Sequence, residues 1–188
     1  MAELQRRGIL KLIFKKLAQK IDATNAAIDT TLIISFRFRH MTGWSGKHKA
    51  IGTKVSLFVG KGGLPIDVLF GKGSERDTVF IPKHLRNVRG RRIKILNLDM
   101  LYTNLDFRRA MWKKGTWINM QTRRGDYIHK RGRKFRYDKE IAVTRFELER
   151  TNGWIKDFRS LRLRRSEHPA IFKAMVYLVL IIVLIRHS

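Results

Sequence analysis

The central strand of this chain is predicted by the run Ala26-Ala27-Ile28-Asp29-Thr30-Thr31-Leu32-Ile33-Ile34-Ser35-Phe36. It is apolar and rich in β-branched residues, which is typical of a strand buried on both faces. Asp29 stands inside this run, although an unpaired charge is rarely tolerated among apolar neighbours. The strand is therefore the first element of the predicted sheet, and its aspartate is the first candidate for chemistry.

Short strand-like and helix-like patterns alternate on the carboxyl side of this strand. Residues 41–53 read as a glycine-punctuated basic loop, and the glycines at 60–63 indicate a hairpin between two strands. Strands are predicted at 55–59, 64–70, 93–98 and 117–121, and helices at 4–21, 78–89, 104–114, 140–160 and 167–186. This order predicts an α/β fold of the ribonuclease-H-like kind, with a mixed sheet flanked by helices.

The composition indicates a folded domain with a basic surface. The chain has 188 residues, of which 41 are Lys or Arg and 15 are Asp or Glu, so its formal charge is +26. With 44% hydrophobic residues, it can also bury a core. Such a surface attracts polyanions and favours DNA or RNA as the partner, with an anionic membrane as the competing partner.

The absence of cysteine excludes disulfides, thiolate metal sites and cysteine nucleophiles. The six histidines show no recognisable zinc spacing. The apolar run at residues 174–185 would rise only about 18 Å as a helix, which is shorter than the ~30 Å hydrocarbon core of a membrane. It is therefore interpreted as a buried core helix in preference to a membrane anchor.

Three acidic residues occupy unusual positions in a chain that has few acids. Asp29 lies within the first strand, Asp99 follows the strand at 93–98, and Glu149 lies on a late helix. Carboxylates converging from two strands and a helix can hold one or two Mg²⁺ ions. Each also has a simpler interpretation: Asp29 as a turn or helix cap, Asp99 as a helix cap, and Glu149 as half of an ion pair with Arg145 or Arg150.

The late helix carries a charge pattern around its glutamate. Arg145, Glu149 and Lys156 are spaced by four and seven residues, so they share one face of a helix. That face can present one metal ligand between two cations that hold phosphates, or it can be a solvated face with ordinary ion pairs. The other two carboxylates favour the first interpretation.

These motifs resemble the DDE transposases of bacterial and archaeal insertion sequences. Ala27-Ile28-Asp29-Thr30-Thr31 resembles the first catalytic block of that family, and Leu98-Asp99-Met100-Leu101-Tyr102 resembles the second. The third block has tyrosine, arginine, glutamate and lysine with two, three and six residues between them. Arg145, Glu149 and Lys156 fit its last three positions, whereas Ala142 occupies the tyrosine position.

The resemblance implies an enzyme that cleaves DNA and transfers its strands by two-metal phosphoryl transfer. Asp29, Asp99 and Glu149 would be the catalytic residues and would hold two Mg²⁺ ions, for which Mn²⁺ can substitute. Arg145 and Lys156 would contact DNA phosphates. The implied partners are double-stranded DNA, as element ends and as target, and a second copy of the chain in a synaptic homodimer. No small-molecule substrate is expected, and a membrane partner is disfavoured.

Residues 122–139 form a further basic segment, predicted to be a solvated or DNA-facing loop. Its expected DNA contacts are Arg123, Arg124, Arg133 and Lys134. Trp44 and Trp112 are also candidates for DNA contact, although a core position is favoured for each.

Only about 25 residues precede the first catalytic strand, fewer than the resemblance leads one to expect. Residues 1–25 are interpreted as a helical remnant of an N-terminal region, and residues 26–188 as the catalytic domain. The chain could then be an active transposase, a frameshift partner, or a truncated and inactive basic DNA-binding remnant. The resemblance places it in a prokaryotic cytoplasm, associated with the nucleoid.

Overall fold

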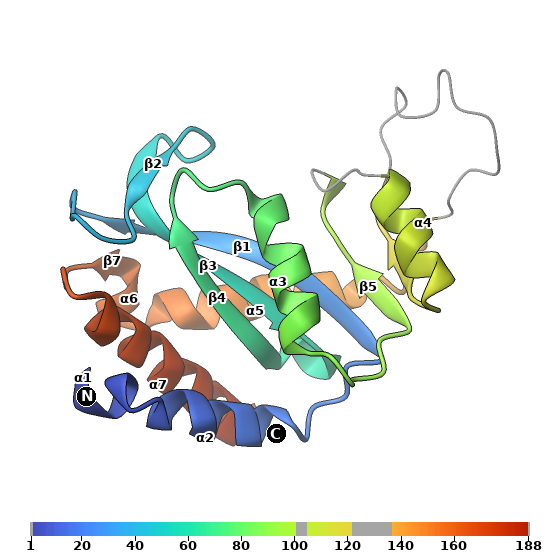
Figure 1. Ribbon diagram of the computed structural model, residues 1–188, viewed down its shortest axis with the longest axis horizontal. Coiled ribbons are helices and arrows are strands. Elements are labelled where there is room, and N and C mark those ends of the chain that lie inside the picture. The colour runs from blue at the N-terminus through green and yellow to red at the C-terminus, as the bar shows by residue number, and fades with distance from the viewer. Residues whose placement is uncertain (1, 101–104, 122–136, 188) are drawn as a thin grey trace.

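A mixed, curled sheet forms the centre of the protein (Figure 1). The computed structural model describes residues 2–100, 105–121 and 137–187. Strand β1 (Asn25–Ser35) pairs antiparallel with β3 (Ala50–Val59) on one side and parallel with β5 (Ile95–Asn97) on the other. Ala26, Ala27 and Ile28 are buried, because helices cover both faces of β1. The predicted central strand is confirmed.

The other strands extend the sheet on both sides of β1. On the far side of β3, β2 (Gly43–Ser45) and β4 (Pro65–Lys72) pair with different halves of that strand. β6 (Trp117–Asn119) pairs parallel with β5, and β7 (Leu163–Arg164) pairs parallel with the end of β1. The seven strands therefore combine parallel and antiparallel pairing, as the sequence predicts.

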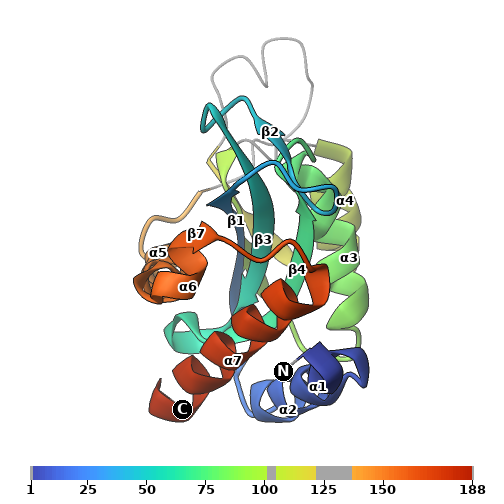
Figure 2. The same ribbon diagram turned by 90° about the vertical axis from the view of Figure 1, so that its left-hand side faces the viewer.

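Helices pack on both faces of this sheet (Figure 2). One face carries α3 (Phe80–Asn87), which follows the short 3₁₀ helix η2 (Asp77–Val79). The opposite face carries α5 (Val143–Asp157), which lies against β1 and against the 3₁₀ turn η1 (Lys61–Gly63) of the β3–β4 hairpin. The fold is thus ribonuclease-H-like, with α5 placed directly over the strand that carries Asp29. Two further helices are α4 (Leu105–Lys113), which precedes β6, and α6 (Arg159–Arg162), which follows α5.

The helices near the two ends of the chain pack against each other, below the sheet in the view of Figure 1. The predicted helix at 4–21 is divided into α1 (Ala2–Arg6) and α2 (Ile9–Ala18), because Gly8 adopts a left-handed conformation with φ of 71°. α2 packs against α7 (Pro169–His187), where the rings of Phe14 and Tyr177 are 5.7 Å apart. Both helices contribute to one hydrophobic core.

The apolar run at residues 174–185 lies in α7 and packs into the core, which confirms its interpretation as a core helix. Among the described residues, α7 is the one helix long and apolar enough to cross a membrane, and half of its most apolar stretch is buried within the fold. Burial raises the pKa of Tyr177 on this helix to about 12.

Two local expectations are wrong. Residues 41–53 are not one loop, because β2 and the first residues of β3 form a short hairpin in which Trp44 pairs with Ile51. The predicted helix at 140–160 does not continue to residue 160, because Phe158 is extended (φ −72°, ψ 116°) and separates α5 from α6. Both features involve segments too short to show a recognisable periodicity of apolar residues in the sequence.

Arg164 fixes the short strand β7 to the rest of the fold. Its side chain is buried and donates hydrogen bonds to Thr53 Oγ1 (2.7 Å) and to the main-chain oxygens of Glu167 (2.8 Å) and His40 (3.2 Å). The guanidinium also lies over the rings of Phe38 and Phe172. Burial lowers the pKa of Arg164 from its ordinary value.

Candidate active site

Asp29 lies on β1, and Asp99 lies two residues beyond the end of the neighbouring strand β5. Ala27 pairs with Asn97 in the parallel β1–β5 ladder, and each aspartate comes two residues later. Since side chains alternate along a strand, both carboxylates project to the same side of the sheet. Burial raises the pKa of Asp29, and the nearby charge of Asp99 raises it further, while Lys47 and Arg145 oppose the shift. The pair is therefore an electrostatically costly arrangement that a cation would relieve.

Replacing Asp29 with asparagine is expected to stabilise the fold at pH 7. The folded-state pKa of Asp29 is raised, so the charged form costs stability once the pH exceeds the pKa of the unfolded chain. The gain should therefore disappear as the pH falls below that value, where the carboxyl is protonated in both states. Urea unfolding at several pH values measures the difference. A variant that is less stable than wild type at pH 7 would show that the Asp29 carboxylate is satisfied in the fold.

Helix α5 brings the third predicted acid and the predicted lysine to the same place. A cavity of about 360 Å³ opens beside β1 and α5. It is lined by Asp29, Thr30, Thr31, Lys47, His48, Glu149, Asn152, Gly153 and Lys156. We call this cavity the acidic cleft. Of the predicted residues, Asp29, Glu149 and Lys156 line it.

Asp99 and Arg145 form an ion pair close to the acidic cleft. Arg145 Nη2 lies 3.4 Å from Asp99 Oδ1, and the same oxygen accepts a hydrogen bond of 2.6 Å from the main-chain nitrogen of Met100. The expected partner of Arg145 was a DNA phosphate. In the structure its partner is an acid that is itself a candidate metal ligand, so a cation bound to Asp99 would compete with Arg145 for that oxygen.

Asn152 was not predicted, although the structure places it in contact with Asp29. Its Nδ2 donates to Asp29 Oδ2 over 3.3 Å, and the residue is largely buried. Its Oδ1 is buried without a hydrogen-bond partner. A signal was present in the sequence, because residue 152 lies three positions after Glu149 and four before Lys156, on the same helix face.

Lys47 and His48 were also missed as individual site residues. They belong to the turn between β2 and β3 and line the acidic cleft together with residues of α5. Burial lowers the pKa of His48, and the positive charges of Lys47 and Lys156 lower it further. His48 is therefore a neutral imidazole at pH 7 beside two cations.

The donor atoms of the acidic cleft suit a hard divalent cation. Asp29 and Glu149 supply carboxylate oxygens to the cleft, Asp99 lies outside its lining and is paired with Arg145, and Asn152 Oδ1 is a buried acceptor without a partner. Mg²⁺ prefers such oxygen ligands and retains several waters. In the described part of the chain, no three acidic or histidine side chains are gathered closely enough to hold one ion together. The carboxylates would have to approach one another around a cation, because they repel each other without it.

The remaining predicted contacts divide into two groups. Arg123, Arg124, Arg133 and Lys134 lie outside the described residues. Trp44 on β2 and Trp112 on α4 are 58% and 62% exposed, so the core position favoured for each is wrong. Trp44 lines a second cavity together with Lys47, next to the acidic cleft.

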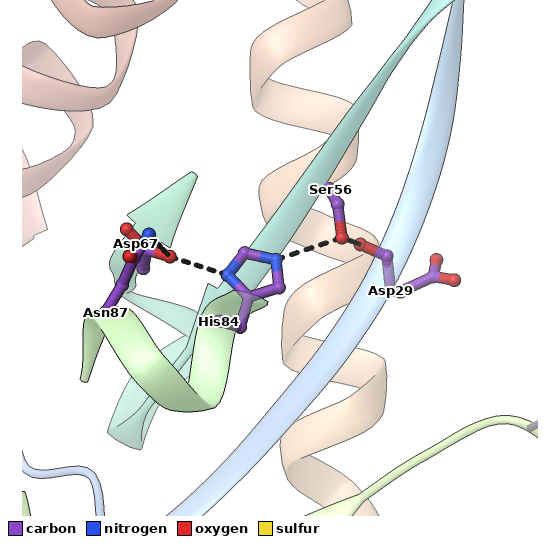
Figure 3. A network of polar contacts seen from close by, with 5 residues as sticks. All are labelled: Asp29, Ser56, Asp67, His84 and Asn87. Carbon is purple, nitrogen blue, oxygen red and sulfur yellow. Dashed lines mark hydrogen bonds and ion pairs between the residues drawn. The ribbon is translucent and has the colours of Figure 1, made fainter. Parts of the chain in front are cut away.

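A network of polar side chains joins α3 to the sheet and reaches the main chain of Asp29 (Figure 3). His84 on α3 contacts Asp67 Oδ2 through Nδ1 (2.7 Å) and Ser56 Oγ through Nε2 (3.0 Å). Asn87 donates to Asp67, and Ser56 Oγ donates to the main-chain oxygen of Asp29 over 3.4 Å. A histidine that contacts a serine through one ring nitrogen and an aspartate through the other is the arrangement used in nucleophilic catalysis. Ser56 and His84 are fully buried, so no substrate reaches them, and the network is structural.

Replacing His84 with alanine is expected to destabilise the fold by about 2 kcal/mol, because Asp67 and Ser56 would each lose a buried hydrogen-bond partner. Arg86, on the same helix but exposed, provides the matched control, and Arg86→Ala should change the free energy of unfolding by less than about 0.5 kcal/mol. Chemical denaturation measures both. Equal stability of His84→Ala and wild type would mean that the network contributes nothing.

The fold resembles that of a solved transposase. The protein is similar to a piggyBac transposase determined by cryo-electron microscopy as a synaptic complex with hairpin DNA, with a TM-score of 0.57 and 12% sequence identity. The match covers 93% of this chain and 49% of the piggyBac chain, so the protein spans about half the length of that relative. At this identity the likeness shows the fold.

The sequence itself shows the family. The sequence model of the transposase DDE domain matches residues 14–184, nearly the whole chain. The protein therefore belongs to the transposase DDE domain family. No curated protein matches the sequence.

Proposed function

We propose that the protein is an insertion-sequence transposase that cleaves DNA and transfers its strands by metal-dependent phosphoryl transfer. The observation that carries this proposal is the position of Asp29. Its pKa is raised, it shares a face of the sheet with Asp99, and it lines the acidic cleft with Glu149 and Lys156. Acids and cations that meet in one cleft suit a metal-bound phosphodiester.

Asp29, Asp99 and Glu149 would hold the cations, with two Mg²⁺ ions as the proposed complement. When bound, the metal supplies electrophilic stabilisation of the reacting phosphate and lowers the pKa of a bound water. Asn152 orients the Asp29 carboxylate through its amide and offers Oδ1 to a water or cation in the acidic cleft. Lys156 on α5 and Lys47 in the turn between β2 and β3 both line the cleft and would hold DNA phosphates near the cut.

The proposal extends to the organisation of the whole protein. Residues 26–188 would form the catalytic domain, and residues 1–25 a helical N-terminal segment whose α2 belongs to the same hydrophobic core. The partners would be the DNA ends of the element, the target DNA and a second copy of the chain in a synaptic complex. The protein would then work in the cytoplasm at the nucleoid.

The test is cleavage of a DNA duplex that carries the inverted repeats flanking the gene. Purified protein is expected to nick this duplex with Mg²⁺ or Mn²⁺, and excess EDTA is expected to abolish the nicking. Cleavage that persists in EDTA would overturn the metal-dependent mechanism. Salt-sensitive DNA binding without cleavage under any metal condition would instead identify a basic DNA-binding remnant.

A further inference from the structure

A second basic region lies at the opposite end of β5 from the acidic cleft. It consists of two adjoining cavities of about 540 and 560 Å³, which share Arg91 and Arg92 in their linings. Six basic side chains line the two cavities: Lys15, Arg89, Arg91, Arg92, Lys94 and Lys114. We call this region the Arg91 surface.

Three segments that are distant in sequence supply the cations of the Arg91 surface. Arg91 is its fixed centre, because its guanidinium donates to the main-chain oxygens of Ala18 (2.6 Å) and Ile21 (2.8 Å) at the end of α2. Burial lowers the pKa of Arg91. The other cations come from α2, from the segment between α3 and β5, and from the turn between α4 and β6.

The outer cations of the Arg91 surface have no acidic partner. Lys15, Arg89, Arg92, Lys94 and Lys114 are exposed, and none of them forms an ion pair within the described ranges. The two acids in the linings are engaged elsewhere: Asp22 accepts hydrogen bonds from Thr24, and Asp67 belongs to the His84 network. Five unpaired cations around a fixed arginine repel one another, so an anion bound here would relieve that repulsion.

The types of residue that line the two cavities favour double-stranded over single-stranded nucleic acid as the bound anion. The residues that line the two cavities include no aromatic side chain, so the surface offers no platform on which unpaired bases could stack. It offers cations, amides and main-chain groups, which are the contacts that proteins make with the phosphates of duplex DNA. Such contacts bind without reading sequence.

The position of the surface separates it from the acidic cleft. Lys94 precedes β5 and Asp99 follows it, so at a rise of about 3.3 Å per residue they are separated by about 17 Å along the strand direction. A phosphate at one end of β5 therefore cannot be the phosphate at the other.

We propose that the Arg91 surface is a second DNA-binding surface, which holds the backbone of a DNA duplex at a segment other than the one in the acidic cleft. The presence of DNA in the acidic cleft rests on the proposed function, whereas binding of a duplex at the Arg91 surface does not depend on which residues are catalytic.

The first experiment measures how binding depends on salt. The quadruple variant Arg89→Gln, Arg92→Gln, Lys94→Gln, Lys114→Gln keeps Arg91 and its bonds to α2. Its matched control neutralises four exposed cations that line neither cavity: Arg37, Lys72, Arg165 and Arg186. Binding to a 30-base-pair duplex is followed by fluorescence anisotropy in EDTA, so that no cleavage step contributes. A single-stranded DNA of the same length is the second probe.

Each lost phosphate contact reduces the magnitude of the slope of log K against log[salt] by about 0.9, so the four substitutions should reduce it by about 3.6. The control should lose less than about 1, and with single-stranded DNA the quadruple variant should lose less slope than with the duplex, because each single-strand phosphate contributes only about 0.7. Equal slope losses in the variant and its control would overturn the proposal. A loss confined to single-stranded DNA would also overturn it. Urea unfolding checks that all proteins have wild-type stability, as expected for exposed positions.

The second experiment locates the DNA directly. The chain has no cysteine, so a single introduced thiol can be labelled alone. Gln19→Cys, in the lining of the Arg91 surface, and Ser160→Cys, exposed on α6 and outside both cavities, would each carry a photo-crosslinker. Duplex DNA should crosslink at least about tenfold more to position 19 than to position 160. Equal crosslinking would show that the Arg91 surface holds no duplex.

Discussion

Glu149→Gln is expected to reduce metal-dependent DNA cleavage by at least about 1,000-fold, an increase of about 4 kcal/mol in the activation barrier. The substitution keeps the size and the hydrogen-bonding oxygen of the side chain and removes only its charge. Glu149 lines the acidic cleft beside Asp29, so its charge is placed to act on a cation or a phosphate there. A neutral amide is a much weaker ligand for a divalent cation than a carboxylate.

Glu147 provides the matched control on the same helix. Residues two positions apart do not share a helix face, and Glu147 is not part of the lining of the acidic cleft. Glu147→Gln should therefore retain cleavage within about twofold of wild type. Thermal unfolding with and without Mn²⁺ gives a second readout, because metal binding should raise the unfolding temperature of wild type and of Glu147→Gln more than that of Glu149→Gln. Unchanged cleavage by Glu149→Gln would remove this residue from the proposed mechanism.

Gly63→Ala is expected to destabilise the protein by about 4 kcal/mol, combining the cost of a left-handed alanine with that of steric overlap. Gly63 ends the turn η1 of the β3–β4 hairpin and has a φ of 73°. A Cβ atom built there would lie 2.5 Å from the main-chain oxygen of Glu147 on α5. Main chain cannot rotate away as a side chain can, so α5 would have to move.

Gly62→Ala separates the two contributions. Gly62 has a φ of 71°, but the atom nearest to a built Cβ is Leu64 Cγ at 3.9 Å. Gly62→Ala should therefore cost only the conformational part, about 1–2 kcal/mol. Chemical denaturation of both variants measures the difference. Equal losses would mean that the contact between η1 and α5 accommodates a methyl group.

The same contact links the hairpin to the acidic cleft. Thr151 Oγ1 donates to the main-chain oxygen of Gly63 (2.6 Å), and Arg150 donates to that of Gly62 (3.0 Å). These bonds hold the helix that carries Glu149 and Asn152. Gly63→Ala should therefore also lower cleavage at temperatures where the variant is still folded, whereas Gly62→Ala should not.

Much of the fold could be predicted because its main elements have strong local patterns. The composition of the run around Asp29 predicts a buried strand. The spacing of the charged residues around Glu149 predicts a helix and the face on which these charges lie. Asp99 was found because it follows a short apolar strand. The positions of these residues along the chain were sufficient to suggest one site, although the assignment of their roles stays a prediction.

Other features depend on contacts that no local pattern contains. His84 is an ordinary helix residue until α3 packs against β3 and β4, where it meets Ser56 and Asp67. Arg164 would be read as a surface cation, yet it is buried by partners from three segments. The pairing of Arg145 with Asp99 likewise joins α5 to the end of β5. In each case the identity of the partner is set by tertiary packing.

The contact between α2 and α7 sets the order in which the protein folds during synthesis. The hairpin of β3 and β4 and its pairing with β1 use residues that emerge early and lie close together along the chain. The ring of Phe14 on α2 packs against Tyr177 on α7, which is synthesised long after α2. The chain between α2 and α7 is long, so bringing these two helices together is slow. Until they pack, the nascent chain exposes the apolar face of α2. The core can therefore close only after α7 has been synthesised, and nascent chains that still lack α7 are natural substrates for chaperones and proteases.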